Sequence, residues 1–414
     1  MWGIWGLYGK PELRRTLLSI QYSVTGAPVA IGTYLSLTIG LGGAPAYIWG
    51  FIMMGLFQLT TCLAVAELAS AIPHSSGPAH WLTMAIAGAA SPGFIIPPWQ
   101  TYLVYCAYAL LSLSINLPRT FKIVNYMLRA VIFTLNGTAI WLLVALLVHA
   151  YPKQSARAIF IEFVNQSGWS SDGLVFFLAL LPAYAAFAGL NNATDLTDEL
   201  ENPQKQVPQV IIGSFFMNSF TALSMIVVYK FCNGDLQSLL DPIGGQPMIQ
   251  LMLNAFHSLP LTIATTAIMI YSFFVSSAAS MITWSRLYWS FSREGSMPFS
   301  RTMSKLTSRD NLPIYAICWN TVLLIAIGAI RMGSTTAMNA LLGAANICII
   351  TAMVTAFALS LYKGRKTFDQ NRWFNLGRWV APASMDWACV VFGGVVVIAT
   401  IYWLAIFSRR RVSD

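Results

Sequence analysis

A long stretch almost without charge constrains the fold of this chain more than any other feature. Between Thr16 and Pro118 the only Asp, Glu, Lys or Arg is Glu67. A soluble surface of this length would carry many charged residues, whereas the hydrocarbon core of a bilayer excludes them. The stretch therefore lies mostly in a membrane, and a water-soluble globular domain is excluded.

Composition extends this conclusion to the whole chain. Of its 414 residues, 57% are hydrophobic and 9% are charged, and the mean hydropathy is +0.63. These values predict an all-α, polytopic membrane protein. The net charge of +9 indicates no nucleic-acid partner, because the basic residues form short clusters between apolar runs, where they act as orientation signals.

Ten apolar runs are long enough to cross a bilayer as helices. They span about 17–41, 45–70, 98–117, 127–149, 174–195, 208–230, 259–284, 313–331, 336–361 and 387–407. Lys and Arg collect on the cytoplasmic side of membrane proteins. Ten crossings place three basic clusters outside, whereas one extra crossing after the second run and another after the ninth bring every cluster inside. Charge therefore predicts twelve crossings in a chain with apolar runs for ten.

The same reasoning predicts the domain organisation. Residues 1–16 form a short cytoplasmic N-terminus, residues 17–407 a single transmembrane domain, and residues 408–414 a cytoplasmic C-terminal tail.

The first run contains residues that a regular helix does not tolerate. Pro28 has no amide hydrogen for the carbonyl of Val24, and Gly26 relaxes the backbone beside it. The helix is therefore expected to break near mid-membrane. Freed polar backbone at that depth implies a binding cavity, since it cannot face lipid.

A family resemblance rests on the segment that closes the fifth run. Residues 184–208 read YAAFAGLNNATDLTDELENPQKQVP and resemble the sixth helix and following loop of fungal amino-acid/choline (GABA-type) permeases of the amino acid–polyamine–organocation (APC) superfamily. Four further segments agree with this family in the expected order: 66–81, 162–170, 285–299 and 333–340.

The resemblance implies a LeuT-like inverted-repeat transporter fold, in which the first and sixth family helices are unwound at the midplane. This sequence departs from the family at the two points that the charge pattern marks. The third family helix is missing between Gly93 and Pro98, and the eleventh between Pro382 and Asp386. About ten helices are therefore expected instead of twelve.

The two helix breaks predict the substrate site. Amide hydrogens after the first break, with the positive pole of the helix dipole, suit a carboxylate, and freed carbonyls at the second suit an ammonium group. The predicted substrate-binding residues are Thr25, Gly26, Ala27, Pro28, Phe187, Gly189 and Asn191. A packing glycine or an ordinary proline kink remains the alternative at each break.

Two positions near the second break differ from the family pattern. The family more often has Asp at position 191 and His at position 195, where this chain has Asn191 and Asp195. Asn191 can form hydrogen bonds but cannot titrate near neutral pH. We therefore expect altered charge coupling, and Asn191 as a packing residue is the alternative.

Candidates for ion coupling and gating follow from hydroxyl and charged side chains. Ser276, Ser277 and Ser280 would suit a sodium site between the first and eighth family helices, although small hydroxylated residues also serve helix packing. The resemblance implies coupling to protons. The candidates for an inner gate are Glu67, Arg286, Asp198 and Glu199. Snorkelling of these charges to the interface is the alternative.

The predicted function is secondary active transport of an amino acid, GABA or choline by alternating access, coupled to protons. Its partners are this small molecule and the lipid bilayer, without nucleic acid, metal or cofactor. Dispersed histidines and the lack of a phosphate-binding loop argue against an enzyme. The expected location is the plasma membrane rather than the vacuole or another organelle. The alternative is a transport-inactive truncated paralogue or mis-spliced product that acts as a sensor or partner-binding membrane protein.

Overall fold

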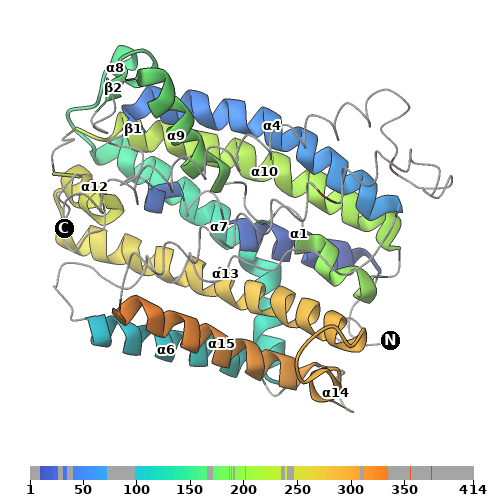
Figure 1. Cartoon of the computed structure of the whole chain (residues 1–414). Helices are drawn as coiled ribbons and strands as arrows, with labels where there is room; N and C mark the ends of the chain where they lie inside the picture. The colour runs from blue at the N-terminus through green and yellow to red at the C-terminus, as the bar shows by residue number, and fades with distance from the viewer. Residues whose placement is uncertain are drawn as a thin grey trace, which may run out of the picture.

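A computed structural model gives the arrangement of the chain (Figure 1). It describes residues 10–26, 31–34, 41–71, 98–118, 120–165, 171–185, 187, 189, 192–200, 202–234, 238–239, 247–307, 312–333, 355 and 374. Most of these residues are helical, which confirms the predicted all-α fold class.

Helices occupy eight of the ten predicted apolar runs. They are α1 (Lys10–Thr25), α4 (Gly43–Ala71), α6 (Pro98–Ile115), α7 (Phe121–His149), α9 (Asp172–Ala185), α10 (Pro203–Phe231), α13 (Leu259–Arg293) and α15 (Ile314–Gly333). The runs at 336–361 and 387–407 lie outside the described residues. Within the described ranges, four helices, α4, α7, α10 and α13, contain segments long and apolar enough to span a membrane, and α6 and α15 contain shorter apolar segments.

Shorter elements connect the long helices. They are η1 (Ile31–Tyr34), β1 (Leu41–Gly42), α8 (Ala156–Phe160), β2 (Val164–Asn165), η2 (Asn192–Glu199), α12 (Pro247–Phe256) and α14 (Ser300–Met303). β1 and β2 pair antiparallel, with Leu41 opposite Asn165 and Gly42 opposite Val164. None of these short elements is long enough to form an apolar span of its own, and hydropathy therefore did not reveal them.

Local sequence explains several helix starts. α10 begins with Pro203, which lacks an amide hydrogen, at a position where that hydrogen would have no partner within the helix. In the same way α13 has a proline in its first two positions. The hydroxyl of Ser155 caps α8 by accepting a hydrogen bond from the amide of Ala158, at 3.1 Å.

The long helices pack in three groups. α4 packs against α9 and α10, and α6 packs against α15. Between these groups lie α1, α7 and α13, which contact one another and connect the two sides (Figure 1). Because α1 contacts α7, α10, α13 and η2, its end lies at the centre of the bundle.

The distribution of polarity is that of a protein in lipid. Large apolar side chains such as Phe133, Val148 and Phe220 are exposed on the outer faces of α7 and α10. Polar side chains such as Gln21 and Asn218 are buried instead. Exposed apolar surface of this extent is unfavourable in water but matches hydrocarbon. The domain borders at residues 16 and 407 stay predictions.

Candidate functional site

The first helix is interrupted where the sequence predicted. α1 ends at Thr25, and the amide of Gly26 closes its last turn by donating to the carbonyl of Tyr22, at 3.0 Å. Gly26 has a φ of +51°, a left-handed conformation that glycine adopts without steric cost. A Cβ there would also lie 3.3 Å from the carbonyl oxygen of Ser23. Ala27 and Pro28 lie outside the described residues, as does the side chain of Thr25.

The second interruption is also present. α9 ends at Ala185, and Gly189 has a φ of +79°. The chain then resumes as the 3₁₀-helix η2 at Asn192, whose amide donates to the carbonyl of Gly189, at 3.2 Å. Asn191 lies outside the described residues. Winding is therefore irregular at both predicted positions, whereas the substrate-binding role of the residues there stays a prediction.

One buried side chain joins the two interruptions. Gln21, in the last turns of α1, is fully buried. Its Nε2 donates to the carbonyl of Gly189, and its Oε1 accepts from the amide of Ala193, both at 2.7 Å. The second break is therefore held directly by the helix that contains the first.

The next two residues of α1 contact three other helices. The hydroxyl of Tyr22 donates to Oδ1 of Asn136 on α7, at 2.9 Å, and lies 3.5 Å from the hydroxyl of Thr221 on α10. The hydroxyl of Ser276 on α13 donates to the carbonyl of Ser23. Because Ser23 lies within the last four residues of α1, its carbonyl has no partner in a regular helix, and the serine supplies one.

Helix direction sets the electrostatics of the site. α1 and α9 both end at the interruptions, so both present their carboxyl-terminal ends there. Unsatisfied carbonyls and the negative pole of each helix dipole collect at these ends. The described part of the site therefore favours a positively charged group.

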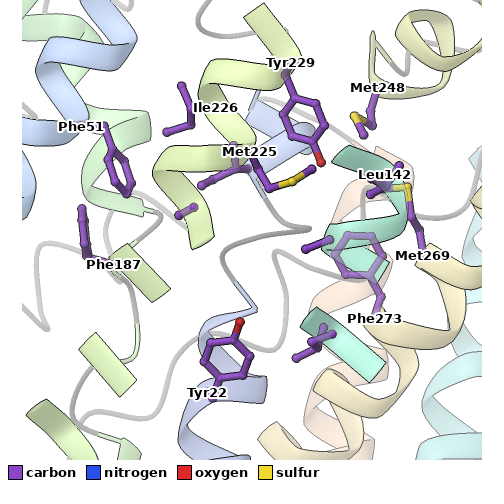
Figure 2. Packing of buried hydrophobic residues seen from close by; sticks show 14 of the residues in the cluster. Tyr22, Phe51, Leu142, Phe187, Met225, Ile226, Tyr229, Met248, Met269 and Phe273 are labelled. Atoms are coloured by element: carbon purple, nitrogen blue, oxygen red, sulfur yellow. The ribbon is translucent and has the colours of Figure 1, made fainter. Parts of the chain in front are cut away.

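Phe187 is packed between aromatic rings. Its ring stacks on Phe51 of α4, with centroids 4.8 Å apart, and on Phe215 of α10, with centroids 5.6 Å apart. Figure 2 shows the rings of Phe51 and Phe187 facing each other, well away from the labelled Tyr22. Phe187 therefore anchors the second break against α4 and α10.

The three candidate coupling serines point to different partners. Ser276 contacts the end of α1, as the predicted ion site requires. Ser277 instead lies 3.2 Å from the hydroxyl of Ser112 and donates to Tyr108, at 3.3 Å, both on α6. Ser280 donates to the carbonyl of Ser276 within its own helix, at 3.0 Å. The structure therefore brings only one of the three, Ser276, to the first break by a hydrogen bond among the described residues.

Three of the four candidate inner-gate residues, Arg286, Asp198 and Glu199, lie on two elements that pack against each other. Arg286 is buried on α13, and its Nη1 donates to the hydroxyl of Ser285, at 3.1 Å. α13 packs against η2, which contains Asp198 and Glu199. Glu67 is on α4, and the side chains of these three acids lie outside the described part of the structure.

Sequence reasoning missed Gln21, Tyr22, Asn136 and Thr221. The available signal was a carboxamide in a run of apolar residues, five positions before Gly26. A polar group buried in an apolar environment needs hydrogen-bond partners, so such a residue predicts a polar contact in the bundle. Its partners could not be named, since they lie on other helices.

Comparisons of the sequence with known proteins identify its family. The profile of the amino acid permease family matches residues 83–413. An uncharacterized amino-acid permease of Schizosaccharomyces pombe is 24% identical, over 95% of this chain and 85% of that protein. The choline transporter of Saccharomyces cerevisiae is 21% identical, over 95% and 82%, and amino-acid permease 2 of Neurospora crassa is 24% identical, over 94% and 83%.

The family profile covers most of the chain, and these relatives align along nearly all of it. Together with the apolar helices, they show that this chain is an integral, multi-pass membrane protein that belongs to the amino acid permease family of transmembrane transporters.

Proposed function

We propose that this protein is a secondary active transporter that moves a small amine, such as an amino acid, GABA or choline, by alternating access. The observation that carries the proposal is the pair of interrupted helices, α1 and α9, joined through Gln21. Broken helices that face each other near mid-membrane provide free backbone groups for a charged solute. The names of the relatives, amino-acid permeases and a choline transporter, support the same substrate class.

Recognition of the substrate follows from the helix ends. The carboxyl-terminal ends of α1 and α9 attract the ammonium group, which the carbonyl of Gly189 and the side chain of Asn191 contact. A substrate carboxylate binds the amides that follow Gly26, at Ala27 and beyond Pro28, whereas Pro28 itself has no amide hydrogen and serves to break the helix. Thr25 and Phe187 complete the proposed site. Choline has no carboxylate, so it would use only the first set of contacts.

Coupling to protons is the proposed source of energy. Among the described contacts, Ser276 is the one sodium-site candidate with a hydrogen bond to α1, so one hydroxyl rather than three would be available to a sodium ion there. Ser277 and Ser280 are engaged elsewhere. These contacts favour proton coupling over sodium coupling.

An inner gate is proposed between Arg286 and the acidic residues Glu67, Asp198 and Glu199. A charge as deeply buried as Arg286 is costly unless acids or hydrogen-bond acceptors compensate it. Breaking the gate in Glu67→Gln should favour the inward-open state. Cysteine accessibility from the cytoplasmic side should then rise, and unchanged accessibility would contradict the gate.

Radiolabelled uptake in a permease-deficient host tests the function. The panel contains amino acids, GABA and choline at two pH values, with sodium present or replaced by a large organic cation. We expect uptake of one class above vector, greater at the lower external pH and independent of sodium. Gly26→Val, which places a branched side chain at a left-handed position, serves as the inactive control. Absence of uptake for every compound would exclude the proposal, and a fluorescent tag would test the plasma membrane location.

One observation favours a second candidate function. The alignment with the S. pombe permease runs over 470 positions, although this chain has 414 residues. The excess of more than 50 positions would hold two spanning helices of about 20 residues each. A chain that lacks these two helices would be a truncated, transport-inactive product, which would act as a sensor or partner-binding membrane protein. Sequencing of genomic DNA around the codons for Gly93 and Pro382 distinguishes this candidate from the transporter. Intronic sequence there that encodes two apolar helices would restore the transporter.

A further inference from the structure

The two hydrogen bonds of Gln21 have a specific relation to helical geometry. Gly189 and Ala193 are four residues apart, and in a continuous α-helix the amide of residue 193 would donate to the carbonyl of residue 189. In this structure the amide of Ala193 donates to Oε1 of Gln21, and Nε2 of Gln21 donates to the carbonyl of Gly189. The carboxamide of Gln21 therefore lies within the position of one missing helical hydrogen bond.

We propose that Gln21 is a positioning residue that keeps the second helix interruption open by inserting its carboxamide between Gly189 and Ala193. A carboxamide suits this position because it carries one acceptor and one donor group, like the peptide unit that it replaces. Both backbone groups keep a partner, so the open turn leaves neither unpaired in a buried place. Both bonds are short, at 2.7 Å, and Gln21 is fully buried, so water does not compete for them.

The position of Gln21 makes the second interruption depend on the first. Gln21 lies on α1, only five residues before Gly26, and Tyr22 and Ser23 fix the same helical turn to α7, α10 and α13. A displacement of α1 therefore draws the carboxamide out of the turn between Gly189 and Ala193. Without it, these two residues can close their own helical hydrogen bond.

The consequence for transport rests on the proposed function. Gly189 presents the carbonyl that we assign to the substrate ammonium, and Gln21 sets its direction. The carbonyl of Gly189 accepts from Gln21, at 2.7 Å, and from the amide of Asn192, at 3.2 Å. A carbonyl oxygen has two lone pairs, so a substrate ammonium would replace the longer bond, from Asn192, while Gln21 stays bound. Loss of Gln21 should therefore weaken substrate binding, although Gln21 itself need not touch the substrate.

Hydrogen exchange of the purified protein in nanodiscs tests the insertion without any transport. Gln21→Leu keeps the bulk of the side chain but removes both bonds. We expect a change of at least tenfold in amide exchange for peptides that cover residues 189–200, and none for peptides of α15. Asn218→Leu is the matched control, because Asn218 is an equally buried carboxamide that donates only within α10 among the described contacts. Unchanged exchange in Gln21→Leu, or an equal change in Asn218→Leu, would overturn the proposal.

A second variant separates positioning from general stability. In Gln21→Glu, the carboxylate accepts from Ala193 but cannot donate to Gly189, whereas the protonated acid does both. The ratio of its uptake to that of wild type should rise at least threefold as the pH falls from 7.5 to 5. Neighbouring titratable groups, such as Asp195 on η2, Arg286 on α13 and Tyr22 on α1, are common to both proteins, so their effects cancel in the ratio.

The outcomes distinguish this inference from the proposed function. If wild type transports nothing, the function is wrong, while hydrogen exchange still decides whether Gln21 holds the turn. If wild type transports, a Gln21→Leu variant with an unchanged KM would remove the link between Gln21 and the substrate site. A Gln21→Glu ratio that stays flat with pH would contradict the donor role of Nε2, even if Gln21→Leu does not fold.

Discussion

The two helix interruptions have similar backbones but are held in different ways. Each contains a left-handed glycine, Gly26 in the first and Gly189 in the second. The end of α1 is held by hydrogen bonds from three helices, through Tyr22 and Ser23. The second interruption is held by stacked rings around Phe187 and by Gln21.

This difference indicates a division of work between the interruptions. A net hydrogen bond contributes about 1 kcal/mol and can be exchanged for a bond to a substrate or to water. Burial of a large aromatic side chain contributes several kcal/mol and cannot be exchanged in that way. We therefore expect the first interruption to rearrange during the proposed transport cycle, and Phe187, at the start of the second, to stay in place on α4 and α10.

The largest effect is expected when the aromatic contact is removed. Phe187→Ala should lower the free energy of unfolding by about 3–5 kcal/mol, because it leaves a cavity between Phe51 and Phe215. Thermal unfolding in detergent measures this loss. Phe133→Ala, at a side chain that is 78% exposed on α7, is the control and should change stability little. Similar losses in both variants would mean that Phe187 does not anchor the second break.

A smaller loss of stability is expected when a side chain is introduced at the left-handed glycine of the first interruption. Gly26→Ala places a Cβ at a left-handed position and 3.3 Å from the carbonyl of Ser23. The conformation alone costs about 1–2 kcal/mol. Gly295→Ala, also left-handed but with open space, should show only this conformational cost, and Gly137→Ala, with open space in α7, should show neither cost. If Gly26→Ala and Gly137→Ala unfold at the same temperature, the backbone at position 26 does not require glycine.

The hydrogen bonds of Tyr22 should contribute less to the free energy of unfolding than the backbone conformation at Gly26 or the aromatic packing of Phe187. Tyr22→Phe should destabilise the protein by about 1 kcal/mol, since it leaves Asn136 without its donor. Double-mutant cycles measure the two contacts separately. Coupling to Asn136→Leu should exceed coupling to Thr221→Val, because the second distance is 3.5 Å rather than 2.9 Å. The reverse order would mean that α10, not α7, holds the end of α1.

The smallest effect on stability is expected among the serines of α13. Ser276→Ala removes one hydrogen bond to the end of α1 and should cost about 0.5–1 kcal/mol, whereas Ser280→Ala should be close to neutral. The KM of uptake distinguishes the two serines further, because of these two only Ser276 has a described contact with the interruption that we expect to rearrange. An equal change of KM in both variants would contradict a special role for Ser276.

Much of the fold could be predicted because membrane helices follow local rules. Apolar runs located α4 and α7, and Gly26 marked the first interruption, since each depends on a short stretch of sequence. α12 was not predicted, because a helix of 10 residues is too short to register as a span. The directions of Ser277 and Ser280 were not predicted either, because spacing along one helix does not tell which neighbouring helix lies beside each face.

By itself, the sequence determined that this protein is a helical membrane protein and where its helices lose regular winding. Both follow from local chemistry, the exclusion of charge from hydrocarbon and the backbone freedom of glycine. Only the tertiary structure decided which side chains meet there. Gln21 and Gly189 are 168 residues apart, and their contact depends on how α1 and η2 pack across the bundle. The carboxamide at position 21 is visible in the sequence, but its partners exist only once the helices are assembled.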